Sequence, residues 1–374
     1  MSSRRVYAQI DLDAVVSNME HMYHKLSEHT KMIAVIKADG YGHGARRLAE
    51  RLEPLGYVFG FAVATAEEAF ELRESGVRKP ILILGYTFPE DYEALIAQDI
   101  RLTIFKEETV NQLSACAKKL NKKTNVHIKV DTGMSRIGVS ADEAGLSAVK
   151  KITAYPEIEI EGIFTHFARA DEADKTYAVK QLEKFQKFVM QCERGGIRIP
   201  YKHCSNSAGI LELQQANLDI VRAGITIYGL WPSDEVSRES IVLTPAMSLK
   251  SSIVYIKTVQ KDMQISYGGT YTAKGPMRIA TIPVGYADGY PRGLSNKGSV
   301  LIRGKRAPIT GRVCMDQFMV DVTAIPDAKE YDEVVLLGSS GEEKITAEEL
   351  ARLSGRFHYE LVCDISKRVP RIYT

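Results

Sequence analysis

Residues able to carry acid–base or covalent chemistry recur at the ends of short apolar, β-branched segments of this chain. They are Lys37, Lys129, Asp131, His166, His203 and Arg222. A lysine that closes an apolar segment is partly removed from water, which disfavours the ammonium form and frees the neutral amine that attacks carbonyl groups. Lys37 is therefore a candidate Schiff-base lysine, although a strand-end lysine that only extends its charged tip into water would give the same pattern.

The segment directly after Lys37 favours the first interpretation. Three glycines in five positions, over residues 40–44, alternate with Tyr41 and His43. Glycine has no Cβ, so a backbone of this composition can approach a ligand closely. The sequence thus predicts a ligand beside Lys37.

The elements that must position these residues alternate in type between about residues 10 and 230. Eight β-branched segments are separated by stretches of helical periodicity, after an opening helix that Asp11 can cap. We expect strands over residues 32–37, 59–65, 81–85, 101–105, 126–130, 158–166, 201–205 and 219–224. We expect the helices between them over residues 45–53, 66–74, 89–98, 107–120, 141–153, 175–193 and 207–214.

This alternation predicts an α/β fold, a (β/α)8 TIM barrel, because strands separated by helices pair in parallel and eight such units close a barrel. A doubly wound open sheet is the alternative, but it usually has fewer strands, and no G-x-G-x-x-G motif follows the first strand. Barrel enzymes carry catalytic groups at the C-terminal ends of the strands and phosphate sites after strands seven and eight. Lys37 would then face the barrel mouth, with Ser207, Gly224 and Ile225 where a phosphate commonly binds.

The pattern changes after residue 232. Short strands separated by Gly, Pro and Asp turns are expected over residues 252–259, 277–284, 299–302, 307–313, 317–322 and 333–337, with one helix over 347–354. We therefore predict a barrel domain over residues 10–232 and a mostly antiparallel β domain over residues 233–374. The N-terminal strand, residues 1–9, is expected to join the β domain.

Composition excludes several other classes of protein. A chain of 374 residues is long enough for two domains, and its formal net charge of +2 does not indicate a nucleic-acid or anionic-membrane partner. The N-terminus lacks the apolar run of a signal peptide, and no stretch approaches a membrane span. Five scattered cysteines without C-x-x-C spacing argue against a disulfide framework and a metal site, and are typical of reduced thiols in a cytoplasmic protein.

Nine sequence blocks, spread over both expected domains, match one known family in order. The blocks cover residues 34–44, 130–138, 203–208, 221–225, 265–271, 282–289, 311–317, 359–360 and 366–371. Any single block is only suggestive, whereas the ordered set is specific. The chain resembles the alanine racemases, pyridoxal 5′-phosphate (PLP) dependent enzymes of fold-type III that combine a barrel with a β domain.

The resemblance implies that Lys37 holds PLP as a Schiff base and acts as one acid–base group. Tyr267 would be the second group, on the opposite face of the substrate's α-carbon, assisted by a chain through His166, Arg222 and His203. A phenol has an ordinary pKa of about 10, so it needs nearby cations to work near neutral pH. The alternative is that Tyr267 makes an ordinary surface contact.

The resemblance also places Arg222 against the pyridine nitrogen of PLP. Arginine is always charged, so that nitrogen would accept a hydrogen bond and stay unprotonated. The weaker electron withdrawal favours simple proton exchange over decarboxylation or transamination. A salt bridge with Asp219 at the barrel rim is the alternative for Arg222.

Further roles are implied by the resemblance alone. The remaining residues expected to bind the cofactor are Tyr41, His166, Asn206, Ser207, Gly224, Ile225 and Tyr359. Those expected to contact the substrate are Arg136, Tyr286, Met315 and Asp316. His203 and Lys129 would support the site, and Lys129 is either carbamylated, as in many family members, or a plain neighbour of Asp131. The family works as a homodimer in which Tyr267, Met315 and Asp316 reach the barrel mouth of the other subunit.

Four other functions compete with interconversion of L- and D-alanine. A racemase acting mainly on serine or another small amino acid would use the same machinery with a changed pocket. A non-enzymatic PLP-carrier protein shares the lysine-bearing barrel but lacks a second domain, so residues 233–374 argue against it. A basic amino-acid decarboxylase usually places a carboxylate at the pyridine nitrogen, which Arg222 does not supply. A Schiff-base aldolase would not explain the β domain.

Overall fold

The computed structural model describes residues 5–374, and the chain divides into two compact units. One unit, here called the barrel unit, contains Val15–Gly40 and Ala45–Thr244. The other, the β unit, contains the described N-terminal residues up to Ala14, the segment Tyr41–Gly44 and Pro245–Thr374. The expected N-terminal strand lies partly outside the described residues, which begin at Arg5.

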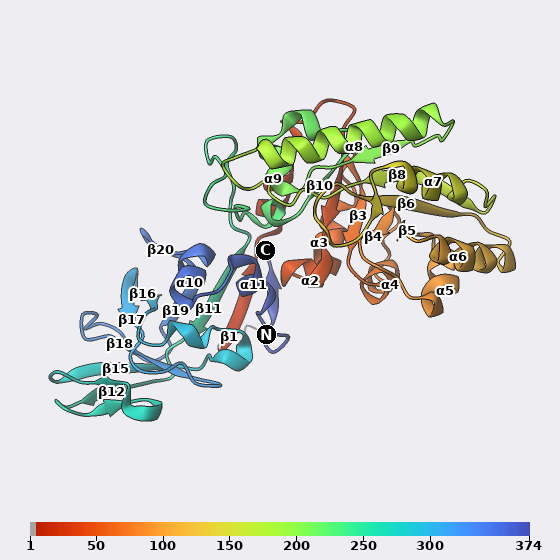
Figure 1. Ribbon diagram of the computed structural model, residues 1–374. Coiled ribbons are helices and arrows are strands. Elements are labelled where there is room, and N and C mark those ends of the chain that lie inside the picture. Colours follow the sequence, from red (N-terminus) through yellow and green to blue (C-terminus); the bar gives the residue numbers. More distant parts are fainter. Residues whose placement is uncertain (1–4) are drawn as a thin grey trace. The chain divides into compact units, whose positions relative to one another are not determined.

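Parallel strands form the wall of the barrel unit in the order β10-β2-β3-β4-β5-β6-β8-β9, with the short β7 (Val139–Ser140) beside β6 (Figure 1). The eight strands on this path are β2 (Lys31–Val35), β3 (Val58–Val63), β4 (Ile81–Ile83), β5 (Ile100–Ile104), β6 (Thr124–Asp131), β8 (Ile158–Phe164), β9 (Tyr201–His203) and β10 (Ile220–Ala223). Beyond β9, the Ser205 carbonyl accepts a hydrogen bond from the Arg222 N–H of β10 at 2.9 Å. The barrel is therefore nearly closed, and the predicted (β/α)8 fold is confirmed.

Helices follow most of these strands, and side-chain caps fix where several of them begin. The helices are α1 (Leu12–Tyr23), α2 (Lys37–Tyr41), α3 (Ala45–Leu52), α4 (Ala66–Glu74), α5 (Tyr92–Ala97), α6 (Glu107–Lys119), α7 (Glu143–Ile152), α8 (Thr176–Arg194) and α9 (Ser207–Glu212). Asp11 Oδ1 accepts the Ala14 N–H at 2.9 Å, as expected for the cap of α1. Asn206 Oδ1 accepts the Gly209 N–H at 3.0 Å and starts α9. These bonds satisfy backbone donors that have no partner inside the helix.

Three sheets make up the β unit. The largest has the order β17-β16-β19-β11-β1-β21, with β20 paired to β19; the others are β12-β15-β18 and β13-β14. The strands are β1 (Val6–Ile10), β11 (Met247–Ser252), β12 (Tyr255–Val259), β13 (Gln264–Ile265), β14 (Tyr271–Thr272), β15 (Met277–Ile282), β16 (Ser299–Ile302), β17 (Lys305–Pro308), β18 (Phe318–Asp321), β19 (Glu333–Ser340), β20 (Glu343–Ile345) and β21 (Arg371–Tyr373). Only β1 and β21 pair in parallel among these described strands, so the predicted mostly antiparallel β domain is confirmed.

Strand β1 joins residues from the two ends of the chain in one sheet. Figure 1 shows β1 in red between β11 and the blue C-terminal segment, and β1 is antiparallel to β11 and parallel to β21. Its buried side chains alternate, as expected for a strand with one face on a core. Strand β1 is thereby part of the β unit.

Several local predictions were wrong. The single strand expected over residues 252–259 is two strands, β11 and β12. The helix α10 (Ala347–Ser354) was expected to be the only one after residue 232, but α11 (His358–Cys363) follows it. The strands expected to reach Lys37 and His166 end earlier, at Val35 and Phe164. Among residues 5–374, no helix combines the length and apolarity needed to cross a membrane.

Candidate active site

Lys37 stands at the exit of β2, at the start of a left-handed turn. Its side chain is half-buried, and Ala38, Asp39 and Gly40 after it have φ angles of 51°, 51° and 61°. Non-glycine residues seldom adopt this conformation, so it persists only where surrounding bonds hold it. Here the Ala38 N–H donates to Glu68 Oε1 at 2.6 Å, and Asp39 Oδ1 accepts the Ala45 N–H at 2.8 Å.

Arg222 is the buried centre of the polar groups inside the barrel. Its Nη1 donates to His203 Nδ1 at 2.8 Å and to the His203 carbonyl at 3.1 Å. Its Nη2 donates to the carbonyls of Thr165 at 2.7 Å and Cys204 at 2.9 Å, and lies 3.4 Å from His166 Nδ1. The alternative salt bridge to Asp219 is not formed; Asp219 instead accepts the Lys202 N–H at 2.8 Å. Within residues 5–374 the Nε–H of Arg222 has no hydrogen-bond partner.

Burial and positive charge keep both histidines of this cluster neutral. The pKa values of His166 and His203 lie well below the usual value, because burial disfavours the imidazolium and Arg222 repels it. The positive charges of Arg136 and Lys37 also repel an imidazolium at His166, which lowers its pKa further. Burial also lowers the pKa of Arg222 to about 10, which leaves it charged at neutral pH.

Lys129 is buried in the same cluster with few groups that stabilise its charge. Its Nζ donates to the Val130 carbonyl at 2.9 Å and lies 5.4 Å from the centre of the Phe164 ring. Burial, followed by repulsion from Arg222, lowers the pKa of Lys129 to about 7, despite the attraction of Asp131. Asp131 is hydrogen-bonded to the backbone, because its Oδ1 accepts bonds from the N–H groups of Gly133, Met134 and Ser135.

The start of α9 and the end of β10 form the predicted phosphate region. Ser207 Oγ accepts the Gly224 N–H at 2.9 Å and lies 3.0 Å from Thr226 Oγ1. Asn206 caps α9, and Ile225 begins a 3-10 turn directly after Gly224. The Gly224 N–H and the Thr226 hydroxyl both donate to Ser207 Oγ, so the Ser207 hydroxyl keeps its own proton to donate to an anion such as a phosphate.

In the β unit, Tyr41 and Tyr359 come together. Their ring centres lie 6.2 Å apart, and Tyr359 is stacked on Phe357 at 4.5 Å. Arg371 Nε donates to the Gly42 carbonyl at 3.0 Å, and a Cβ at Gly42 would collide with the Val362 carbonyl. Burial raises the pKa of Tyr41, so its hydroxyl remains a hydrogen-bond donor.

The other predicted residues of the β unit lie on two loops that are tied together. The Tyr286 N–H donates to the Cys314 carbonyl at 3.0 Å, and the Ala287 N–H donates to the Met315 carbonyl at 3.1 Å. Asp316 Oδ1 accepts a bond from Arg368 at 2.8 Å. Tyr267 lies on a third loop, beside Ser266, whose Oγ donates to the Arg312 carbonyl at 2.9 Å, and 73% of the tyrosine surface is exposed.

Two family models match almost the whole chain. The N-terminal domain of alanine racemase matches residues 10–232, and the C-terminal domain of alanine racemase matches residues 246–373. The chain belongs to the alanine racemase family. This confirms the expected family and the expected class of enzyme, an isomerase.

Individual members of the alanine racemase family agree over the full length. The chain is 47% identical to the alanine racemase of Clostridium perfringens over 370 residues, which cover 99% of this chain and 95% of that protein. A solved alanine racemase of Clostridium difficile 630 matches with a TM-score of 0.96 and 42% identity, covering 100% of this chain and 97% of that one. The structure of that racemase in complex with cycloserine gives a TM-score of 0.94 and 41% identity, covering 100% and 96%.

In this alanine racemase family member, the predicted residues thus fall into two groups. The barrel unit contains Lys37, Lys129, Arg136, His166, His203, Asn206, Ser207, Arg222, Gly224 and Ile225. The β unit contains Tyr41, Tyr267, Tyr286, Met315, Asp316 and Tyr359. Lys129, His166, His203 and Arg222 form one cluster in the barrel unit, and Tyr267 belongs to the β unit.

Sequence reasoning missed Glu68 and assigned no role to Arg371; these two residues hold the backbone around Lys37 and Tyr41. Glu68 Oε2 also accepts the Ala64 N–H at 2.7 Å, so this one carboxylate fixes the exits of β2 and β3. Its spacing from Thr65, which caps α4, is that of a capping box and could have drawn attention to it. Arg371 lies in the last of the nine sequence blocks, but the block gave it no role; its two terminal nitrogens donate to the carbonyls of Ile365, Ser366 and Val369.

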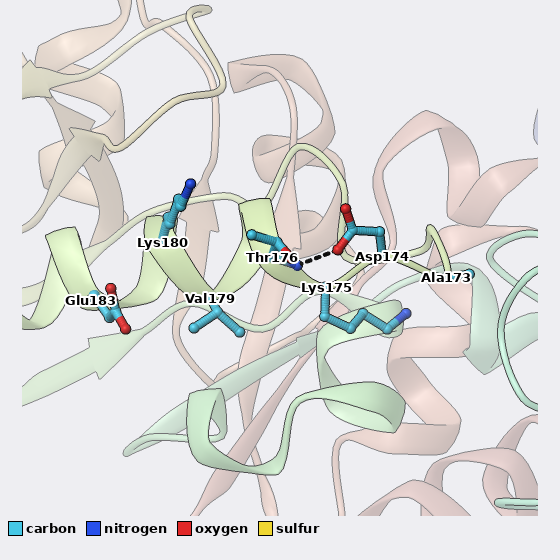
Figure 2. A pocket seen from close by; sticks show the side chains of 7 residues that line it. All are labelled: Ala173, Asp174, Lys175, Thr176, Val179, Lys180 and Glu183. Carbon is cyan, nitrogen blue, oxygen red and sulfur yellow. Dashed lines mark hydrogen bonds between the residues drawn. The ribbon is translucent and has the colours of Figure 1, made fainter.

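An open surface hollow at the start of α8 contains none of the predicted residues. Figure 2 shows its lining, Ala173, Asp174, Lys175, Thr176, Val179, Lys180 and Glu183, with Asp174 accepting the Thr176 N–H at 2.9 Å. Its charges are mixed, and its geometry is that of an ordinary helix start. We assign no function to it.

Proposed function

We propose that this protein interconverts L-alanine and D-alanine, with PLP bound at Lys37 and with Lys37 and Tyr267 as the two proton-transferring groups. The observation that carries the proposal is a lysine at a barrel strand exit in a chain of the alanine racemase family. The neighbouring Arg222 cluster supplies the charge pattern that such a reaction needs. A supply of D-alanine for peptidoglycan precursors is the physiological role we propose.

The residues of the barrel fit PLP. The Nε–H of Arg222 is a donor without a protein partner within residues 5–374, as expected of a group that meets the ring nitrogen. We propose the Ser207 hydroxyl and the Ile225 N–H as donors to the phosphate; the Gly224 N–H already holds Ser207 Oγ in place, and Asn206 caps the helix that begins at Ser207. We propose Tyr41 and Tyr359 as further phosphate ligands and His166 as a ring contact.

When bound, PLP withdraws electrons from the α-carbon of an attached amino acid and so makes its α-hydrogen acidic. The Lys37 amine accepts or returns a proton on one face of that carbon, and the Tyr267 hydroxyl does the same on the other. Among residues 5–374 Arg222 has no carboxylate as a hydrogen-bond partner, so it would present a fixed positive charge to the ring nitrogen of PLP. A ring nitrogen that stays unprotonated withdraws fewer electrons, which restricts the chemistry to proton exchange.

We propose alanine as the substrate, with serine or another small amino acid as the competing choice. Among residues 5–374, the N–H groups of Met315 and Asp316 have no hydrogen-bond partner, so both can donate to a carboxylate. Arg136 would contact the phenolic oxygen of PLP and the substrate carboxylate. Tyr286 and Tyr359 are bulky, and we propose that Tyr286 narrows the entrance to favour a methyl side chain.

We further propose a homodimer with shared active sites. A tyrosine that transfers protons must be covered during the reaction, whereas 73% of Tyr267 is exposed in the single chain. Contact with the barrel mouth of a second copy would cover Tyr267, Met315 and Asp316. A cytoplasmic location is proposed because the sequence has five scattered cysteines, none in a disulfide among residues 5–374.

The proposal is tested by incubating the purified protein and PLP with L-alanine and, separately, with L-serine. Chiral chromatography then measures the rate at which each D-enantiomer appears. We expect D-alanine to form much faster than D-serine. Faster inversion of serine would mean that serine, and not alanine, is the preferred substrate. If neither amino acid is inverted, the proposed function is wrong.

A further inference from the structure

A chain of hydrogen bonds runs from Arg222 through the inside of the barrel, away from the predicted cofactor site. Arg222 Nη1 lies 2.8 Å from His203 Nδ1, and His203 Nε2 lies 2.8 Å from His127 Nδ1. His127 Nε2 lies 3.1 Å from Glu161 Oε2. All four side chains belong to the barrel unit, and both histidines are fully buried.

The two ends of this chain fix the direction of every bond in it. A guanidinium can only donate and a carboxylate can only accept. His203 Nδ1 therefore accepts from Arg222, which places the single proton of a neutral His203 on Nε2. His127 Nδ1 accepts that proton, so His127 also carries its own proton on Nε2 and donates it to Glu161. Burial lowers the pKa of both histidines, so each has one ring proton.

The backbone is built to admit this chain. In the pairing of β6 with β8, Val126 faces Ile160 and His127 faces Gly162, so Glu161 is an extra residue, as in a β-bulge. A Cβ at Gly162 would lie 2.5 Å from His127 Nδ1, so only glycine leaves room for the ring.

The far end of the chain is anchored by an ion pair between Glu161 and Arg101. Arg101 Nε lies 3.1 Å from Glu161 Oε2, and its Nη2 lies 3.3 Å from Oε1. Arg101 Nη1 is bound in turn to Asp99 at 2.7 Å. Burial raises the pKa of Glu161, but the hydrogen bonds from His127 and Arg101 and the charge of Arg101 outweigh burial and lower it, so Glu161 remains a carboxylate.

Burying a carboxylate and two histidines inside a barrel costs desolvation free energy, and branched apolar side chains normally fill this space. Packing alone does not explain them, because a polar chain lowers stability unless each member is satisfied. This chain of hydrogen bonds holds His203 Nδ1 as a fixed hydrogen-bond acceptor for Arg222 Nη1. Phe164 supports the same arrangement, since its ring stacks on His203 at 4.8 Å with a 6° angle between the planes.

We propose that His127 and Glu161 are positioning residues, which hold His203 in the Nε2–H tautomer so that His203 Nδ1 fixes the Arg222 guanidinium for the ring nitrogen of PLP. The last step rests on the proposed function, whereas the tautomers are a property of the protein alone. If Glu161 could donate, the chain could reverse, and His203 would then direct an Nδ1–H at the Arg222 N–H. The negative charge of Glu161 prevents this reversal.

The tautomers can be read directly by two-bond ¹H–¹⁵N NMR of the purified protein labelled with ¹⁵N-histidine, without substrate. Loss of signals in a His127→Asn and a His203→Asn variant assigns the two rings. We expect both rings to show the Nε2–H pattern in the wild type. An Nδ1–H pattern at either ring would overturn the proposal, and this result would not depend on whether the protein inverts alanine.

The functional part is tested with Glu161→Gln, which keeps the size of the side chain and removes its charge. We expect a mixed tautomer pattern at His127 and His203, and roughly tenfold weaker binding of PLP, as for loss of a charge-assisted hydrogen bond. The matched control is Glu159→Gln on the same strand, where Glu159 pairs with Lys123 on the exposed surface; it should match the wild type. Wild-type tautomers or wild-type PLP affinity in Glu161→Gln would contradict the positioning role.

A second pair of variants keeps the proposal testable if Glu161→Gln fails to fold. His127→Asn retains an acceptor near the position of Nδ1, whereas His127→Leu retains only apolar volume. We expect His127→Asn to preserve the Nε2–H pattern of His203 and most of the PLP affinity, and His127→Leu to lose both. Equal behaviour of the two variants would mean that His127 only fills space.

Discussion

Arg222 Nη1 lies 2.8 Å from His203 Nδ1, and the imidazole nitrogen accepts this bond because a guanidinium can only donate. The other terminal nitrogen, Nη2, donates to the carbonyls of Thr165 and Cys204. Within the described part of the chain, residues 5–374, neutral acceptors alone therefore hold the fixed positive charge. This arrangement favours a cofactor ring whose nitrogen stays unprotonated, and it makes Arg222 the structural centre of the proposed site.

Replacing Arg222 by lysine should destabilise the protein. Lysine offers one nitrogen in place of the planar fork and leaves the His203, Thr165 and Cys204 acceptors partly unpaired. We expect the free energy of unfolding, measured with urea, to fall by about 2–4 kcal/mol. Arg169→Lys, in an exposed pair with Glu172, is the matched control and should change it by less than about 0.5 kcal/mol. An equally small change in Arg222→Lys would show that the buried bonds contribute little.

Replacing Lys37 by alanine should remove the covalent attachment of PLP. The visible absorbance of the protein-bound cofactor should disappear after gel filtration, and inversion of alanine should fall to the background rate. Lys123→Ala, at an exposed lysine that pairs with Glu159, should keep both properties. Visible absorbance retained by Lys37→Ala would assign the cofactor to another residue.

Replacing Tyr267 by phenylalanine deletes one hydroxyl and keeps the ring. If this hydroxyl transfers a proton, inversion of alanine should slow by about 10²–10⁴-fold, because general acid–base groups contribute that much. The absorbance of bound PLP should stay unchanged. Tyr255→Phe, at another exposed tyrosine of the β unit, serves as the control and should keep full activity. Full activity of Tyr267→Phe would remove this residue from the chemistry.

Lys129 should make stability depend on pH in the alkaline range. In the unfolded chain its amine holds a proton up to a pKa of 10.5, whereas in the folded protein burial lowers the pKa to about 7. Between these values the unfolded state binds more protons, so the free energy of unfolding rises with pH from about 7 to about 10.5. Below pH 7 the folded state carries the full cost of the buried ammonium.

Replacement of Lys129 by methionine should abolish this rise, which we expect to amount to a few kcal/mol. Urea titrations of both proteins at several pH values, in buffer free of bicarbonate, measure it. Identical pH profiles of the two proteins would show that Lys129 does not cause the rise.

A neutral amine at physiological pH is also the form that reacts with CO₂, so we propose that carbamylation of Lys129, implied by the family resemblance, occurs here. A carbon-13 carbamate signal that disappears in Lys129→Met would reveal it.

The sequence was sufficient to predict the barrel, because strands and helices alternate with clear periodicity from β2 to β10. It did not reveal the left-handed turn after Lys37, because Ala38 and Asp39 have no preference for that conformation and the Glu68 carboxylate imposes it from another segment. The six-residue helix α11 was missed because so short a segment shows no helical period.

The polar chain beneath Arg222 was also beyond sequence reasoning. A lone buried histidine such as His127 is most often a satisfied core residue, and Glu161 faces inward only because β8 carries an extra residue there. One extra residue in a strand moves every following side chain to the opposite face of the sheet, and no local sequence pattern predicts it. Arg222 and His203 were found because they stand at strand ends and in blocks that resemble a known family, whereas His127 and Glu161 lie outside those blocks.

The central claim is that two groups on opposite faces of one carbon exchange protons, and isotope incorporation during early turnover tests it most directly. L-alanine and, separately, D-alanine are incubated with the PLP-loaded protein in deuterated water, and the α-position of both enantiomers is analysed before equilibrium. We predict deuterium in nearly every product molecule and little in the remaining substrate, from either direction. Product that retains the original hydrogen of the substrate would contradict the account, because a single group would then remove and return the same proton.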